Sequence, residues 1–354
     1  MRIRSSAAPR EVRVGDYFVD GAQQFISTGC TVLDCRLAGA RAPGGWALGR
    51  VVNLVGDTQV GKTLIAIETC ANFHRQYPKG HIWYREAEGA FDVRYAERVG
   101  LPVGVVDFGS DGENSVWDTI DDISEDLDAC LSKAEKSKQP GIYIIDSLDA
   151  VSSRAELSRR AGDGTYGLEK QKLLGQLFRR MVRRLRAARV TLLVVSQIRE
   201  NIGIMFGERY KRVGGKSLDF YASQILWLHH KKRLPATVRG VERITAVRIL
   251  AKSKKNKVGG DVFGECEFVL RFGYGVDDLE ASLQWLRGVG LLDRVGIRAR
   301  AAKDQDEAIV KMLRDNWRAD VTVARACIEN VADIVRRAWR EIDDRFLPQR
   351  CKYG

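Results

Sequence analysis

The sequence predicts an α/β fold: a core with a mostly parallel central sheet, a short N-terminal extension and a small helical C-terminal domain. The first observation is a set of short apolar runs bounded by turn residues, which are Val51–Val55, Gly141–Ile145, Val190–Val195, Ile225–Leu228, Ile244–Leu250 and Cys266–Phe272. Several runs are rich in Val and Ile, which is typical of strands buried on both faces. The second observation is that helix-length segments such as Thr63–Arg75 and Gly167–Ala188 lie between the runs. Strands that alternate with helices predict a parallel sheet.

The chain of 354 residues is long enough for two domains, since one domain usually has about 100–200 residues. Residues 1–28 read as an extension that is basic at first, and we expect the core to span residues 29–275. The strand pattern fades beyond that point, and residues 302–315 and 321–345 have the spacing of amphipathic helices. We therefore assign residues 276–354 to the small C-terminal domain.

Composition excludes several classes of protein. Hydrophobic residues make up 45% and charged residues 29% of the chain, a mixture that excludes a largely disordered or fibrous protein. The apolar runs are much shorter than the roughly 20 residues that a membrane span needs, so we expect no membrane partner. The N-terminus shows no apolar signal segment, and the seven cysteines are odd in number without Cys-x-x-Cys spacing. These features predict a cytoplasmic protein with reduced thiols.

The net charge of +12 is concentrated in one part of the chain. Residues 154–257 contain 26 Lys and Arg but 7 Asp and Glu, whereas residues 101–130 contain nine acidic side chains and no basic one. This uneven distribution indicates a face that binds a polyanion. A solvated, soluble surface explains the charge equally well, so charge alone leaves both interpretations open.

Eight residues between a predicted strand and a predicted helix match the phosphate-binding pattern G-x-x-x-x-G-K-[ST]. They are Gly56, Asp57, Thr58, Gln59, Val60, Gly61, Lys62 and Thr63. The glycines let the backbone wrap around a phosphate, and the N–H groups and the helix N-terminus supply positive potential. The Lys62 ammonium can reach the β and γ phosphates, and the Thr63 hydroxyl can ligate Mg²⁺. The pattern predicts a site for ATP with Mg²⁺.

An acid at the end of another core strand predicts a second Mg²⁺ ligand. Asp146 follows the apolar residues 142–145, where it would hold the ion directly or through a water; capping of the next helix is the alternative. Hydrolysis also requires a group that polarises water, and a carboxylate after the strand-like segment His81–Tyr84 is suited to this. The candidates are Glu86, Glu88 and Asp92, and the spacing alone does not choose among them.

Beyond these sites, the chain resembles the bacterial RecA recombinase family over about residues 26–275. The matching segments come in the family's order and are residues 26–29, 56–63, 87–92, 95–96, 145–147, 162–163, 167–168, 196–199, 202–207, 214–215, 220–223 and 255–257. Residues 202–223 carry the pattern most particular to recombinases. The resemblance implies a RecA-like P-loop NTPase core.

The resemblance also implies roles for single residues. Glu88 aligns with the family's catalytic glutamate, so it becomes the preferred base that activates water. Asp92 and Tyr95 align with residues that contact the adenine and its sugar. Gln197 aligns with a glutamine that senses the γ-phosphate and passes its presence to the adjoining DNA loop.

Two subunits are expected to share each ATP. Lys255 and Lys257 align with two lysines of the family that reach the ATP of the neighbouring subunit. There they would stabilise charge on the transferring phosphoryl group, as an arginine finger does in other ATPases. Together with Lys62 on the phosphate loop, they complete the expected catalytic set.

Two segments are predicted to bind DNA, from their chemistry and from the resemblance. The first segment holds Arg160, Tyr166, Lys170 and Lys172, and the second holds Arg199, Met205, Phe206, Arg209, Lys211, Arg212, Gly214 and Gly215. Cations neutralise phosphates, glycines give the backbone freedom, and the apolar pair Met205-Phe206 can separate bases. Core packing is the alternative for that pair, which the flanking glycines and the dense charge disfavour.

The resemblance therefore implies an ATP-dependent recombinase that polymerises on single-stranded DNA and catalyses homologous pairing and strand exchange. Its expected partners are single-stranded and double-stranded DNA, further copies of the chain in a helical polymer, and proteins that bind single strands or load the polymer. Two other functions stay open at this point: a hexameric DNA helicase or motor with the same core, and a regulatory relative that binds ATP without exchanging strands.

Overall fold

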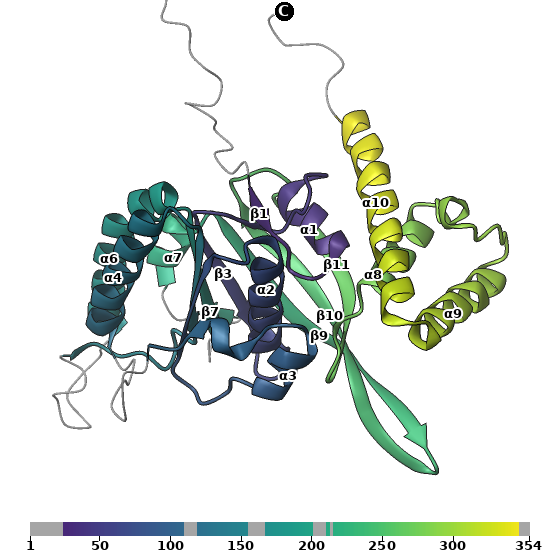
Figure 1. The fold of residues 1–354 in the computed structure, drawn as a ribbon, viewed down its shortest axis with the longest axis horizontal. Helices are drawn as coiled ribbons and strands as arrows, with labels where there is room; N and C mark the ends of the chain where they lie inside the picture. Colours follow the sequence, from purple (N-terminus) through teal and green to yellow (C-terminus); the bar gives the residue numbers. More distant parts are fainter. Residues whose placement is uncertain (1–23, 110–118, 155–166, 201–209, 213–214, 347–354) are drawn as a thin grey trace, which may run out of the picture.

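The computed structural model describes residues 24–109, 119–154, 167–200, 210–212 and 215–346 (Figure 1). Its centre is a ten-stranded sheet with the order β12-β11-β10-β9-β3-β7-β6-β4-β5, and the tenth strand, β8, pairs with β7. These strands are β3 (Val51–Gly56), β4 (His81–Glu86), β5 (Val106–Asp107), β6 (Gly141–Asp146), β7 (Val190–Glu200), β8 (Tyr210–Arg212), β9 (Gln224–Val238), β10 (Val241–Asn256), β11 (Glu265–Arg271) and β12 (Gly275–Val276). A second, two-stranded sheet pairs β1 (Phe25–Ile26) with β2 (Trp46–Ala47).

The predicted α/β fold with a mostly parallel sheet is confirmed. Neighbouring strands from β9 through β3, β7, β6 and β4 to β5 run parallel. Strands β9, β10, β11 and β12 form an antiparallel extension of the same sheet. All six residues of β3 and all six of β6 are buried, which explains why these runs have no polar alternation.

Helices cover both faces of the sheet, and each face has its own apolar core (Figure 1). One face packs against α1 (Thr31–Ala38), α2 (Lys62–Gln76) and α3 (Val93–Arg98), and the other packs against α4 (Ile120–Ser137), α6 (Gly167–Ala188) and α7 (Gly215–Tyr221). Within β6, Ile142 and Ile144 belong to the first core, whereas Tyr143 and Ile145 belong to the second. This alternation follows from the two-residue period of a strand.

A helical segment follows the sheet. It comprises α8 (Asp278–Gly288), the 3₁₀ helix η3 (Leu292–Val295), α9 (Ala302–Arg318) and α10 (Val321–Phe346); a further 3₁₀ helix, η2 (Val103–Val105), precedes β5. Leu279 of α8 and Val335 of α10 belong to the same apolar cluster as α1 and α2, so this segment shares its core with the sheet. The domain boundary at residue 276 stays a prediction. Across the part of the chain that the structure describes, no helix is long and apolar enough to cross a membrane.

Strands β9 and β10 continue beyond the body of the sheet as a long hairpin (Figure 1). Its turn is Arg239-Gly240, with φ of 51° and 80°, the left-handed pair that a tight hairpin turn requires. The sequence predicted only the segments Ile225–Leu228 and Ile244–Leu250, because apolar patterning detects the buried half of a strand. Residues 235–243 are exposed on both strands and therefore carry no such pattern.

Candidate functional site

The phosphate loop joins the buried strand β3 to α2, which begins at Lys62. Gln59 and Gly61 have φ of 60° and 82°, so the loop turns sharply before the helix. The positive φ of Gly61 favours glycine, and a Cβ there would also displace the end of the Leu270 side chain on β11. The first N–H groups of α2 and its positive dipole end thus face the loop, which is the geometry that binds a phosphate.

Lys62 is held inside this loop. Its Nζ donates a hydrogen bond to the carbonyl oxygen of Asp57, 2.7 Å away, and the side chain is buried. Burial lowers the pKa of Lys62, and the carboxylates of Asp146 and Glu88 oppose that shift. A buried ammonium that faces two carboxylates and a carbonyl is suited to bind the phosphates of a nucleotide.

Asp146 lies at the carboxyl end of β6, beside the loop, as the sequence predicted. Burial raises its pKa, and hydrogen bonds from the hydroxyls of Tyr84 and Thr63 oppose that shift. A carboxylate and a hydroxyl that already contact each other are oxygen donors of the kind Mg²⁺ takes together with phosphate oxygens and water. The described residues contain no cluster of three or more acidic, His or Cys side chains that could bind a metal alone. The donor set therefore fits Mg²⁺ bound together with a nucleotide.

The three carboxylates that follow β4 have different surroundings. Glu86 accepts hydrogen bonds from the backbone N–H groups of residues 88–90 at 2.7–2.9 Å, so its carboxylate stabilises the turn. Asp92 caps α3 by accepting a hydrogen bond from the N–H of Tyr95 at 2.9 Å. Glu88 lines the cavity beside the phosphate loop, whereas the other two do not. The structure therefore distinguishes the surroundings of the three carboxylates, which residue spacing could not do.

Glu88 is held by two neighbours at the strand ends. The Ser147 hydroxyl donates to its Oε1, and Nε2 of Gln197 lies 3.1 Å and 3.3 Å from its two oxygens. The backbone N–H of Gln197 donates to Oδ2 of Asp149 at 2.7 Å, which holds this part of β7 against the turn after β6. Just beyond Gln197, β7 pairs with β8, with Ile198 opposite Arg212. A glutamine in contact with Glu88 is therefore joined by one strand to the segment predicted to bind DNA.

These side chains line a cavity of about 1110 Å³. Its opposite wall was missed by sequence reasoning and is formed by Leu228, His229, His230, Arg233, Ile244, Val247, Leu270 and Phe272. These residues belong to β9, β10 and β11 or follow them directly. The sequence identified the five apolar ones only as parts of core strands and assigned no element to His229, His230 and Arg233. Phe272 gave a signal, since it is an aromatic residue at the end of a predicted strand; the structure shows that it is 52% exposed. Five of these eight residues are apolar and three are basic or imidazole side chains, so the wall offers both packing and polar contacts to a nucleotide.

Some predicted residues lie away from this cavity. Tyr95 is buried, and its hydroxyl lies 3.3 Å from Oε2 of Glu68 on α2. Lys255 donates to the carbonyl oxygen of Phe220 at 3.0 Å and to that of Asp219, and Lys257 is exposed at the end of β10. Neither lysine lines the cavity of its own chain. A role in ATP hydrolysis would therefore require the ATP of another subunit.

The predicted DNA-binding residues are only partly covered by the structure. Arg160, Tyr166, Met205, Phe206, Arg209 and Gly214 lie outside the described residues, and Arg199, Lys211, Arg212 and Gly215 are described only as backbone in β7, β8 and α7. Lys172 is exposed on α6. Lys170 instead donates to the carbonyl oxygen of Leu148 at 2.8 Å and to that of Val151, so its ammonium holds α6 against the turn after β6.

The hairpin adds basic surface that the sequence did not assign to an element. Lys232, Arg233, Arg239 and Arg243 are all exposed on β9, β10 or the turn between them. They belong to the basic segment 154–257, so part of its charge projects from the molecule.

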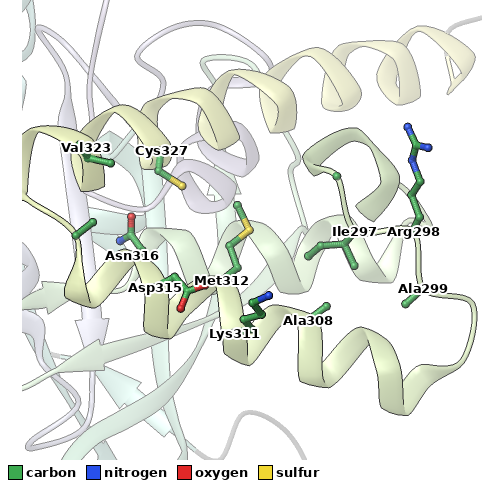
Figure 2. Close-up of a pocket in the computed structure, with 12 residues that line it drawn as sticks. Ile297, Arg298, Ala299, Ala308, Lys311, Met312, Asp315, Asn316, Val323 and Cys327 are labelled. Carbon is green, nitrogen blue, oxygen red and sulfur yellow. The ribbon is translucent and has the colours of Figure 1, made fainter.

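A second cavity, of about 510 Å³, lies between α9, α10 and residues 296–299 (Figure 2). Figure 2 shows Ile297, Met312, Val323 and Cys327 around it, with Lys311 and Asp315 also on its lining. The lining is mostly apolar and has no glycine-rich turn at a helix N-terminus, so it lacks the features that bind phosphate. The cavity beside the phosphate loop is the candidate functional site.

Comparison with known proteins gives a consistent family match. The family model described as the RecA N-terminal domain matches residues 12–277. Protein RecA of Streptomyces venezuelae is 31% identical over 265 residues, which is 75% of this chain and 64% of that protein. Protein RecA of Nocardioides is 31% identical over 81% of this chain and 73% of that protein. Protein RecA of Thioalkalivibrio sulfidiphilus is 28% identical over 96% of this chain and 89% of that protein. The chain thus matches just under two thirds of the Streptomyces protein and more of the others.

Proposed function

We propose that this chain, which belongs to the RecA family, is a DNA-dependent ATPase that polymerises on single-stranded DNA and catalyses homologous pairing and strand exchange. The observation that carries the proposal is the convergence of Lys62, Thr63, Asp146, Glu88 and Gln197 on one cavity. These residues come from α2, β6, β7 and the segment after β4, and together they offer the groups that ATP hydrolysis requires.

Each group has a defined task in the proposed hydrolysis. The loop N–H groups and Lys62 hold the phosphates of ATP, and Thr63 and Asp146 hold Mg²⁺, which neutralises charge on the phosphate oxygens. Glu88 orients a water toward the γ-phosphate and accepts its proton. Gln197 contacts Glu88 in this structure and directly precedes the segment of β7 that pairs with β8, so it can report bound ATP to residues 199–216.

Polymerisation would give a role to the two predicted lysines that do not reach the cavity of their own chain. We place Lys255 and Lys257 against the ATP of a neighbouring copy, so that bound ATP bridges two subunits. Single-stranded and duplex DNA are the proposed polyanions for the basic surface. Proteins that coat single strands or load the polymer are proposed as further partners, in the cytoplasm where the DNA lies.

The proposed function predicts that single-stranded DNA stimulates ATP hydrolysis and that the protein forms helical filaments on it. Electron microscopy with a slowly hydrolysed ATP analogue, together with a steady-state ATPase assay, checks both. The Lys62→Ala chain is the control and should form no nucleotide-dependent filament, because it lacks the ammonium that binds the phosphates. Closed rings would support a helicase or motor, and ATP binding without DNA stimulation would support a regulatory relative.

Salt titration of DNA binding tests where the strand lies. Each neutralised phosphate releases counterions, so log affinity for single strands should fall with log salt by about 0.7 per contact. The double change Arg209→Ala with Lys211→Ala should flatten this slope. Phe206→Ala should keep the slope and impair strand exchange, since this side chain carries no charge and is proposed to separate bases.

A matched control removes the same two charges elsewhere. Arg239→Ala with Arg243→Ala takes them from the exposed hairpin, and a site at residues 199–216 predicts a smaller change in slope for this pair. If the hairpin pair flattens the slope and the loop pair does not, the single strand lies along β9 and β10 instead.

A further inference from the structure

Tyr84 on β4 contacts Asp146, the proposed Mg²⁺ ligand on the neighbouring strand. Its hydroxyl donates a hydrogen bond to Oδ2 of Asp146 at 2.6 Å, and both residues are buried, at 0% and 2% exposure. The parallel register of β4 and β6 places Glu86 beside Asp146, so Tyr84 lies two residues before that point on the neighbouring strand. This contact joins two strands that are about 60 residues apart in the sequence.

Aromatic packing fixes the Tyr84 ring. Phe91 packs edge-on against it with ring centroids 4.9 Å apart, and Phe108 lies 6.2 Å away. Phe91 and Phe108 also pack against each other at 4.9 Å, so the three rings form one cluster. Because Phe91 lies three residues after Glu88, the same cluster supports the segment that carries the proposed base. The Tyr84 hydroxyl therefore has little freedom to leave Asp146.

The hydrogen bond from Tyr84 restricts the orientation of the Asp146 carboxylate. Partners that bind a metal ligand from behind set its orientation, and their loss typically weakens metal binding by about 10- to 100-fold. Tyr84 engages Oδ2 of Asp146, and the Thr63 hydroxyl, on the side of the phosphate loop, also bonds this carboxylate. We propose that Tyr84 is a positioning residue that orients the Asp146 carboxylate for Mg²⁺ bound with a nucleotide. This inference rests on the proposed ATP site and adds a residue that no sequence motif marks.

The chain contains a matched control. Tyr143 on the adjacent strand β6 is also buried, and its hydroxyl donates to Oδ2 of Asp126 at 2.6 Å. That pair belongs to the opposite face of the sheet and does not line the nucleotide cavity. Tyr84→Phe and Tyr143→Phe each remove one buried hydroxyl with the same type and length of hydrogen bond, so general loss of stability should be similar in both.

The experiment measures the affinity for a fluorescent ATP analogue in EDTA and across a Mg²⁺ titration. Tyr84→Phe should keep the affinity in EDTA and raise the Mg²⁺ concentration for half-maximal binding by about tenfold. Tyr143→Phe should leave both quantities as in the wild type. Unchanged affinity in EDTA shows that the variant is folded, and thermal unfolding without nucleotide provides a second check. In the Asp146→Asn chain, Tyr84→Phe should cause no further change, because the carboxylate that it orients is gone.

Each result has a distinct meaning. A Mg²⁺ requirement for Tyr84→Phe within twofold of the wild type, or an equal rise in Tyr143→Phe, overturns the role of Tyr84 and leaves the recombinase proposal intact. Conversely, Mg²⁺-linked binding without DNA-stimulated hydrolysis contradicts the recombinase and still supports the role of Tyr84. Nucleotide binding that does not respond to Mg²⁺ in the wild type contradicts both.

Discussion

The Glu88→Gln chain is expected to bind ATP as tightly as the wild type and to hydrolyse it at least about a hundredfold more slowly. The amide keeps the size of the side chain and can still contact Ser147 and Gln197, but it cannot accept a proton from water. Filaments of this variant on single-stranded DNA should therefore form with ATP itself and persist. A steady-state ATPase assay and a nucleotide-binding titration on the same preparation check the expectation.

Two further isosteric changes make the test specific. Glu97→Gln lies on the exposed face of α3 and should hydrolyse ATP as the wild type does. Glu86→Gln replaces the carboxylate that accepts hydrogen bonds from residues 88–90, so it should lower the thermal stability of the protein. Glu88→Gln should instead lose hydrolysis without losing thermal stability. Hydrolysis by Glu88→Gln at the wild-type rate would contradict the assignment of Glu88 as the base.

The second large effect concerns the shared ATP. Lys255→Ala and Lys62→Ala should each lose at least about a hundredfold in hydrolysis, since one lacks a cation from the neighbour and the other lacks the phosphate-binding ammonium. When the two chains are mixed, some activity should return, because a Lys62→Ala subunit still offers Lys255 to an intact phosphate loop. The rescue can only be partial, because only one orientation of each mixed interface is complete. An ATPase assay over a range of mixing ratios measures it.

Lys254→Ala is the matched control for this experiment. Lys254 is the neighbouring lysine on β10, is exposed, and lies 5.4 Å from the centre of the Trp227 ring. Its loss should leave hydrolysis unchanged, whereas the loss of Lys255 removes a cation that contacts the end of α7 in its own chain and is proposed to reach the ATP of the next. Absence of rescue at every ratio, with both variants folded and visible in the same filaments, would mean that the lysine does not act in trans.

The amino-acid sequence alone was sufficient for the phosphate loop and the fold class. Residues 56–63 are contiguous, and their task depends on local backbone geometry, so the motif carries the whole prediction. The mostly parallel sheet was also predictable, because helices on both faces leave the central strands without an alternation of apolar and polar residues, and runs such as Val51–Val55 reflect that burial. Asp146 was predictable as a candidate Mg²⁺ ligand for a similar reason, since it is an acidic residue directly after the apolar residues of a buried strand.

The tertiary structure decided what depends on contacts between distant segments. The family resemblance already favours Glu88 over Glu86 and Asp92. The structure adds that the carboxylates of Glu86 and Asp92 accept hydrogen bonds from backbone N–H groups, and residue spacing contains no such information. The cavity wall from β9, β10 and β11 and the hydrogen bond from Tyr84 to Asp146 depend on strand order and register. Side chains on one strand look alike in sequence whether they pack in a core or border a site, because only the neighbouring strand determines what they touch.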